Sequence, residues 1–332
     1  MTPALRDVSF PLTGPHAAPA PPAGPLTWSN VLMTAARPPK ADRPRAWSDG
    51  LRRELTARLD PAVATAVWVT GSVGRSEAVP GSDLESLAVV VDPDTRAVRR
   101  AVATTDLSGA PWFAETSAAS AADPRLVRTA AGWSGAADGW AADPARDLGV
   151  VHLGLLADAC PLTDGHDDPE LLHRLAVGAV RAHPTVLADV LADALATRAS
   201  VPSRLRVPTR ADPVVDLKAS VLTPVVKLAR WASLRAGVTA TATDARLDLA
   251  ADPDVLPADR WESLREAARV AARLRWEVRL RADADGPGTD RVPLSGLTAA
   301  ERAGLRAAAR EIAGAQRTLD YLRSTGQFRQ PG

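Results

Sequence analysis

The sequence is poor in cysteine and in long apolar runs, and both absences restrict the function. Its 332 residues include one cysteine, Cys160, which excludes an intrachain disulfide and favours a reducing compartment. No apolar run approaches the roughly 20 residues that span a bilayer, and the N-terminus lacks the basic and apolar regions of a signal peptide. We therefore expect a cytoplasmic protein with no membrane partner.

An excess of charge of one sign is also absent. Lysine and arginine together number 40, and aspartate and glutamate 39. This balance indicates neither a general affinity for nucleic acid nor attraction to an anionic membrane, so we expect no nucleic-acid partner. Only three of the basic residues are lysines, namely Lys40, Lys218 and Lys227.

The length allows two domains, and the first half contains both strand and helix patterns. Residues 1–45 are rich in proline and alanine and predict a flexible tail. Leucines at helical spacing predict a helix over 47–59, and Asp92-Pro93 has the pattern of a helix start. The apolar run 150–156 predicts a strand that ends at Asp158. We therefore place one domain at 46–165.

The second half reads as helical throughout and predicts a separate bundle over 166–330. Helix starts are expected at Asp168-Pro169, after Pro184, at Asp212-Pro213 (with a bend near Pro224), at Pro257, and at the capping box from Thr298 to Glu301. A polar linker is expected over 283–293. Strands followed by helices predict an α+β fold, with a mixed sheet and flanking helices in the first domain and an all-helical second domain.

The chemistry is concentrated in a short segment between two apolar runs. Gly71-Ser72-Val73-Gly74-Arg75-Ser76-Glu77 follows one predicted strand, and Ser82-Asp83-Leu84-Glu85 precedes the next. Carboxylates two residues apart on a strand share a face, and hard cations such as Mg²⁺ prefer oxygen ligands. A glycine-rich turn leaves backbone N–H groups free for phosphate oxygens. The alternative interpretation is a hairpin with a glycine-rich turn and solvated acids.

This spacing resembles the nucleotidyltransferase superfamily of DNA polymerase β, and in particular the branch of protein-PII uridylyltransferase and glutamine-synthetase adenylyltransferase. In the second half, Asp216-Leu217-Lys218, Leu228-Ala229-Arg230, Thr243-Asp244-Ala245-Arg246-Leu247 and Leu274-Arg275 resemble a substrate-binding helical region of bacterial nucleotidyltransferases. That family is often fused to CBS and cyclic-nucleotide-binding modules. The chain departs from the family pattern at 113–120, and at Cys160, where the family tends to have arginine.

The resemblance implies a set of site residues. Asp83 and Glu85 would hold Mg²⁺, and Asp158 would act as the third metal ligand and as the base for the acceptor hydroxyl; Asp92 and Asp94 are rivals for that place. Gly71, Ser72 and Gly74 would bind the phosphates. Arg75 would either contact phosphate or pair with Glu77 to brace the turn. The basic positions Lys218, Arg230 and Arg246 would contact the nucleotide or a partner protein, or would form solvated or intrahelical ion pairs.

The expected function is therefore a Mg²⁺-dependent nucleotidyltransferase that moves an NMP from an NTP to an acceptor hydroxyl. The resemblance implies a protein acceptor, as in the signal-transducing uridylylation of a PII protein. One alternative is a catalytically weak nucleotide-binding regulatory module, which the departures at 113–120 and Cys160 would favour. Another is an antitoxin-like transferase that modifies a toxin partner.

Overall fold

The computed structural model describes residues 42–91, 96–104, 120–164, 166–202, 212–282 and 289–326. Most of the predicted tail therefore lies outside the described residues, although 42–45 belong to the start of the first described helix. The expected helix start at Asp92-Pro93 and all but the last residue of the 113–120 segment also lie outside them.

The first half combines short strands with helices, as the sequence predicts. Its elements are α2 (Arg43–Arg58), α3 (Pro61–Ala64), β1 (Val67–Thr70), α4 (Gly71–Gly74), β2 (Glu85–Val90), α5 (Arg96–Thr104), β3 (Val127–Thr129), α6 (Ala130–Ala142), α7 (Gly149–Ala157) and β4 (Cys160–Pro161). Short 3₁₀ turns at Pro124–Leu126 and Arg146–Leu148 join some of them.

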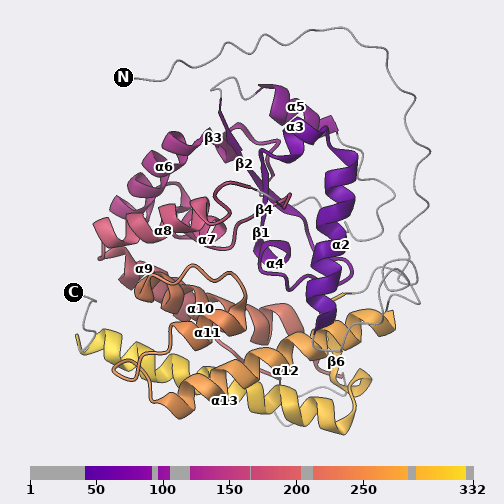
Figure 1. The fold of residues 1–332 in the computed structure, drawn as a ribbon. Coiled ribbons are helices and arrows are strands. Elements are labelled where there is room, and N and C mark those ends of the chain that lie inside the picture. The colour runs from indigo at the N-terminus through magenta and orange to yellow at the C-terminus, as the bar shows by residue number, and fades with distance from the viewer. Residues whose placement is uncertain are drawn as a thin grey trace, which may run out of the picture.

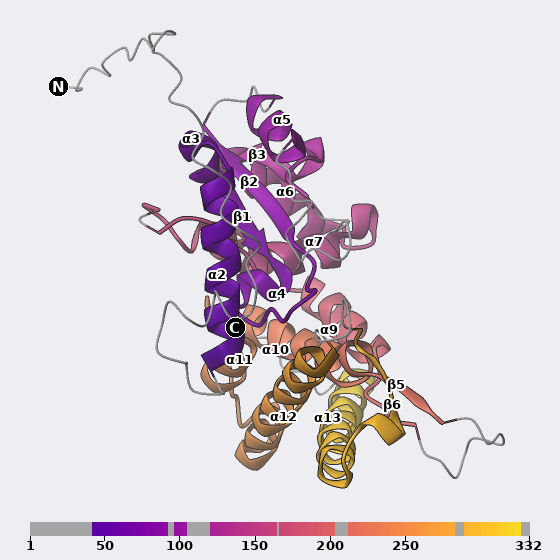
Figure 2. The same cartoon turned by 90° about the vertical axis from the view of Figure 1, so that its right-hand side faces the viewer.

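A four-stranded mixed sheet in the order β3-β2-β1-β4 organises this half (Figure 1). Strand β1 pairs antiparallel with β2 and β4, whereas β2 and β3 are parallel. Val67 and Val69 pack in a cluster with α2, while Trp68 between them packs in the core formed with α6 and α7. The sheet is therefore covered on both faces, which explains why β1 is apolar at successive positions. Figure 2 shows α2 on one side of the sheet and α6 and α7 on the other.

The predicted strand over 150–156 is wrong, because this segment forms helix α7. The run is apolar at every position except His152, and periodicity alone does not separate a buried strand from a buried helix. The helix buries Leu153 and Leu156 between α6 and α8. Only Cys160 and Pro161 continue as a strand, paired with the middle of β1.

The second half is helical apart from one small ribbon. Its elements are α8 (Leu171–Ala182), α9 (Val186–Ala196), β5 (Val214–Asp216), a π-helix (Lys218–Leu222), α10 (Thr223–Ala236), α11 (Thr243–Leu249), α12 (Ala258–Ala282), β6 (Arg291–Pro293), a 3₁₀ turn (Leu294–Gly296) and α13 (Ala299–Ser324). The capping box of α13 is present, with both Thr298 and Glu301 contacts. The α+β fold class is confirmed.

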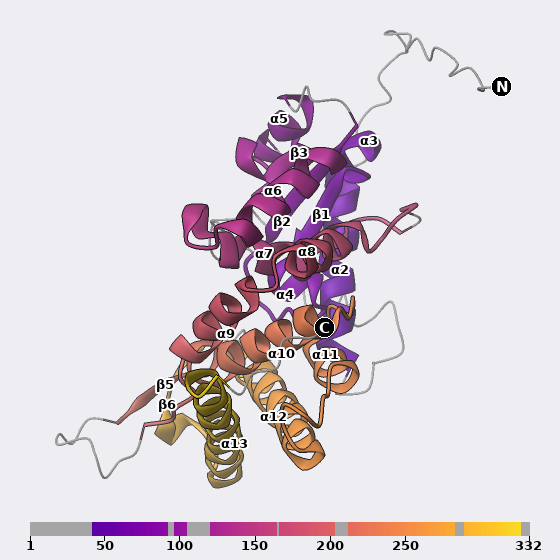
Figure 3. The same ribbon diagram turned by 90° about the vertical axis from the view of Figure 1, so that its left-hand side faces the viewer.

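Two expectations in this half are corrected by the ribbon. Asp212-Pro213 precedes strand β5 rather than a helix, and part of the expected linker is strand β6, which pairs antiparallel with β5. Non-local pairing of two three-residue segments leaves almost no periodic signal in the sequence. Figure 2 and Figure 3 show this ribbon beside the α12–α13 hairpin.

The two halves share a continuous core. Helix α8 packs on α6 and α7 of the first half, and one hydrophobic cluster runs from Trp68 of β1 to Leu319 of α13. A second contact joins Trp47 of α2 to Trp276 of α12, whose ring centroids are 6.4 Å apart. The domain boundary at 165/166 stays a prediction. Within the described ranges no single helix is long and apolar enough to cross a membrane; α8 and α9 meet that test only as a pair bent by 114°.

Candidate functional site

The Gly-Ser segment forms a tight turn between β1 and the acid pair. Strand β1 ends at Thr70, which pairs with Glu85, and Gly71 follows with φ of +62°. A Cβ on Gly71 would lie 1.6 Å from Glu85 Oε2, so the turn packs directly on this carboxylate. The backbone carbonyl of Ser72 accepts a hydrogen bond from the Glu77 N–H at 2.8 Å. Both the left-handed φ and the close contact require glycine at 71.

The acid pair lies at the entrance to β2 rather than wholly on it. Glu85 is the first strand residue, and Asp83 belongs to the preceding loop, so the expectation that strand alternation aligns them is not met. Burial raises the pKa of Glu85, partly offset by the positive charges of Arg75 and Lys218. Asp83 Oδ2 lies 3.6 Å from the Nζ of Lys218. Lys218 therefore brings a positive charge from the second half to both carboxylates.

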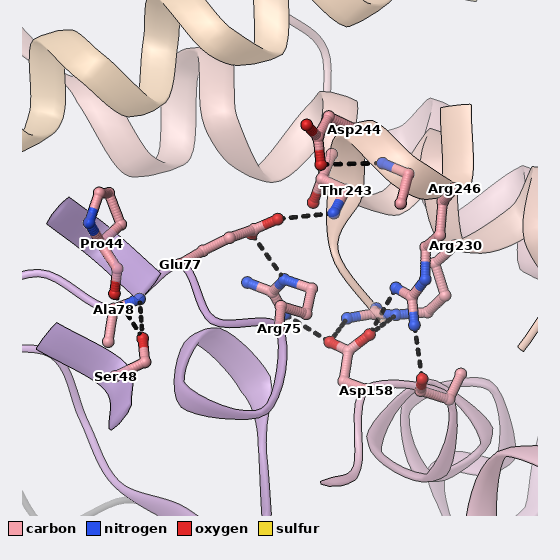
Figure 4. Close-up of polar contacts among 12 residues, drawn as sticks. Pro44, Ser48, Arg75, Glu77, Ala78, Asp158, Arg230, Thr243, Asp244 and Arg246 are labelled. Atoms are coloured by element: carbon pink, nitrogen blue, oxygen red, sulfur yellow. Dashed lines mark hydrogen bonds and ion pairs between the residues drawn. The ribbon is translucent and has the colours of Figure 1, made fainter. Parts of the chain in front are cut away.

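Asp158 occupies a different environment from the one the sequence predicts. It follows the last residue of α7 and is buried, with 1% of its surface exposed. Its carboxylate accepts from Arg75 Nη1, from Arg230 Nη2 at 2.5 Å and from Arg246 Nη1 at 2.7 Å (Figure 4). Burial alone would raise the pKa of Asp158, but the guanidiniums of Arg230, Arg75 and Arg246 hold it well below its usual range.

These contacts leave Asp158 poorly suited to the two roles expected of it. Its oxygens are engaged by three cations, and a carboxylate with a strongly lowered pKa is a weak proton acceptor at neutral pH. In the part of the chain that the structure describes, no three His, Cys, Asp or Glu side chains gather as a metal-binding group. The structure thus brings together Asp83, Glu85 and Lys218, and places Asp158 with the arginines.

Arg75 braces the turn, which is one of the two roles open to it from sequence. Its Nε donates to Glu77 Oε2 at 2.9 Å, in addition to the bond with Asp158. The other Glu77 oxygen accepts from the backbone N–H of Thr243, at the start of α11, at 2.7 Å. The turn is therefore connected to the second half through Glu77 as well as through Asp158, as Figure 4 shows.

Arg246 is interior and does not face the site. It has no exposed surface, and its remaining donors bond the carbonyls of Ala157 and Ala240. A phosphate does not reach a guanidinium enclosed in this way, so the predicted nucleotide contact is unsupported at this position. The family resemblance placed Arg246 among the basic positions of the helical half but carried no information on its burial.

Close packing at two glycines stabilises the contact between the two halves around Asp158, which is called the joint below. A Cβ on Gly74 would lie 2.1 Å from the carbonyl oxygen of Asp158, and one on Gly154 would lie 2.9 Å from Arg230 Nη1. Gly74 is one of the phosphate-binding positions expected from the sequence. In the structure, its lack of a side chain lets α4 contact the chain that carries Asp158.

The remaining site residues allow a test of fit for a divalent cation. Asp83 and Glu85 supply oxygen donors, the type that Mg²⁺ prefers, and Mg²⁺ is commonly held by one or two carboxylates plus substrate phosphates. The Lys218 ammonium, 3.6 Å from Asp83 Oδ2, shows that this carboxylate is placed to pair with a cation. Asp83 and Glu85 therefore fit such an ion, without Asp158. The rivals Asp92 and Asp94 lie outside the described residues.

Comparison with known families is informative for the second half. Residues 184–322 match the family model described as "Putative nucleotidyltransferase substrate binding domain". No curated protein matches the chain. The match covers α9 to nearly the end of α13 and includes Lys218, which contacts Asp83. This region is thus related to a domain family of nucleotidyltransferases, which supports the predicted resemblance for the second half.

Proposed function

We propose that this chain, whose residues 184–322 match a nucleotidyltransferase substrate-binding domain, is a Mg²⁺-dependent nucleotidyltransferase. It transfers an NMP from an NTP to an acceptor hydroxyl on a protein. The observation that carries the proposal is the 3.6 Å contact between Lys218 of the matched region and Asp83, beside the Gly-Ser turn. A phosphate-binding turn, an acid pair and a lysine then share one location.

Each group of residues would have a separate role in an in-line displacement. The backbone N–H groups of the turn at Ser72 would bind the terminal phosphates, and Lys218 would neutralise phosphate charge from the opposite side. Asp83 and Glu85 would hold Mg²⁺, which when bound stabilises the charge that develops on the phosphate oxygens. The acceptor oxygen forms a bond to the α-phosphorus as the α–β phosphoanhydride bond breaks. Pyrophosphate departs, and the hydroxyl proton passes to solvent.

Labelled nucleotides test the proposal directly. Each NTP, labelled at the α-phosphate or at the γ-phosphate, is incubated with the protein, Mg²⁺ and cell lysate. Transfer of α label with no transfer of γ label is the expected result. Asp83→Asn should lower the rate by about 10²-fold or more, because it removes charge from the metal-binding pair. Asp138→Asn, on an exposed acid of α6, is the matched control and should leave the rate unchanged.

A second candidate function rests on the lack of a third carboxylate beside the acid pair among the described residues. Because the described residues hold no three-residue acid group at the site, a regulatory module that binds NTP without turnover is the alternative. Calorimetry with Mg²⁺ and NTP separates the two. Binding that is weakened by Asp83→Asn, with no α-label transfer for any NTP, would favour the regulator. Transfer of γ label would contradict the proposed NMP transfer, and full activity in Asp83→Asn would contradict the assignment of the acid pair.

A further inference from the structure

The strongest polar cluster outside the site lies in the segment that the sequence predicts to be a linker. Asp290 is buried, with 9% of its surface exposed, between Arg275 and Arg279 of α12. Arg275 donates to both carboxylate oxygens at 2.8 and 3.1 Å, and Arg279 does so at 3.1 and 3.0 Å. Two bidentate guanidinium pairs on one carboxylate make a geometrically specific clamp. Burial opposes ionisation, but both arginines lower the pKa of Asp290 to about 2.

The clamp connects directly to the backbone beside Lys218. The carbonyl of Asp290 accepts the N–H of Leu217 at 2.9 Å, and Leu217 immediately precedes Lys218. Strand β6 begins at the next residue and pairs with β5, with Arg291 opposite Asp216. The Asp216 side chain in turn accepts the N–H of Ala219 at 2.8 Å. Lys218 therefore starts a π-helix whose entry is held by β6 and by the clamp.

The same segment of α12 is fixed to the first half of the molecule. Trp276, next to Arg275, contacts Trp47 of α2 edge to face and lies in the cluster that covers one face of the sheet. The carboxylate of Asp83 belongs to that half. A continuous set of packed and hydrogen-bonded residues thus runs from the sheet, through Trp276 and the clamp, to Lys218.

We infer that Asp290, held by Arg275 and Arg279, is a positioning residue that places the Lys218 ammonium opposite Asp83. This inference deepens the proposed function and rests on it only for the identity of the nucleotide. A clamp is suited to this task because Lys218 itself is half-exposed and has a flexible side chain. The position of the Lys218 ammonium therefore depends on the position of the Lys218 backbone.

Lysine acylation read by mass spectrometry gives a direct measurement, because the chain has only three lysines, Lys40, Lys218 and Lys227. Lys227 pairs with Asp193 at 2.8 Å and serves as the internal reference. In Asp290→Asn without nucleotide, the ratio of Lys218 to Lys227 acylation should rise about two- to fivefold, the change that loss of an exposed ion pair produces. Asp290→Glu should restore part of the original ratio, and Asp320→Asn, in an exposed ion pair of α13, should leave it unchanged.

A second variant keeps the test decisive if Asp290→Asn does not fold. Arg279→Gln leaves Arg275 on the carboxylate and should shift the Lys218 ratio in the same direction, by less. An unchanged ratio in a folded clamp variant would overturn the inference, as would a parallel rise at Lys227. Protection of Lys218 by Mg²⁺ and ATP or UTP is measured separately. Its absence in the wild type would count against the proposed function while leaving the ratio without nucleotide as a valid test of the clamp.

Discussion

Replacement of Asp158 by asparagine is the sharpest test of the joint between the two halves. The carboxylate is the shared partner of Arg75, Arg230 and Arg246, which come from α4's C-cap, α10 and α11. Asparagine keeps the shape but removes the charge, and its amide group places N–H donors against guanidinium donors. Three cations, two of them almost fully buried, then lose their common counter-charge.

The expected loss is large on the scale of protein stability. Removing one partner of a buried ion pair costs about 3–5 kcal/mol, because the other charge stays buried without compensation. A folded protein is typically stable by about 5–15 kcal/mol, so Asp158→Asn should be severely destabilised. The difference in the free energy of unfolding between the wild type and Asp158→Asn should also depend on pH. Since the pKa of Asp158 is lowered in the fold, its contribution is complete above the unfolded value of about 3.9 and decreases as the pH falls below it.

Urea unfolding followed by tryptophan fluorescence provides the assay, since the chain has nine tryptophans. The difference between wild type and Asp158→Asn should be constant from pH 7 to about pH 5 and should narrow towards pH 4 and below. Asp248→Asn is the control, because the Asp248 side chain is 60% exposed and loses only an ion pair with Arg265. This change should lower the free energy of unfolding by less than about 1 kcal/mol. A loss below about 1 kcal/mol in Asp158→Asn would refute the assignment of Asp158 as the shared counter-ion.

Two further predictions concern packing and pH. Gly74→Ala should destabilise the fold by more than about 1 kcal/mol, the scale of overpacking, because its Cβ would lie 2.1 Å from the Asp158 carbonyl oxygen. Gly135→Ala, which has open space around it on α6, is the control and should be neutral or stabilising in a thermal melt. Burial and the Arg246 charge lower the pKa of His173 to about 4, so stability should be full above about pH 6.5 and fall by about 2 kcal/mol at pH 5 as the unfolded chain takes up the proton. His173→Leu should lose this dependence, and an equal dependence in both proteins would assign it to other groups.

Local patterns determined several parts of the fold and of the candidate site. Contacts and spacings between residues near in sequence account for four features: the glycine at 71, the pairing of Arg75 with Glu77, the capping box at Thr298 and the long helix α12. Such contacts depend on backbone conformation and on short spacings, which a single sequence displays directly. The α+β class followed from the same signals.

Tertiary structure alone decided the partners of the charged residues that pair across long stretches of sequence. The run before Asp158 is a helix that buries Leu153 and Leu156, whereas its apolar pattern is compatible with either a strand or a helix. Asp158 pairs with three arginines that are 72 to 88 residues away in sequence, and Lys218 pairs with Asp83. Asp290 is buried, although the sequence predicts a polar linker at this position. A charge in a sequence has no preferred partner until packing removes it from water, and burial then makes the choice of counter-charge energetically decisive.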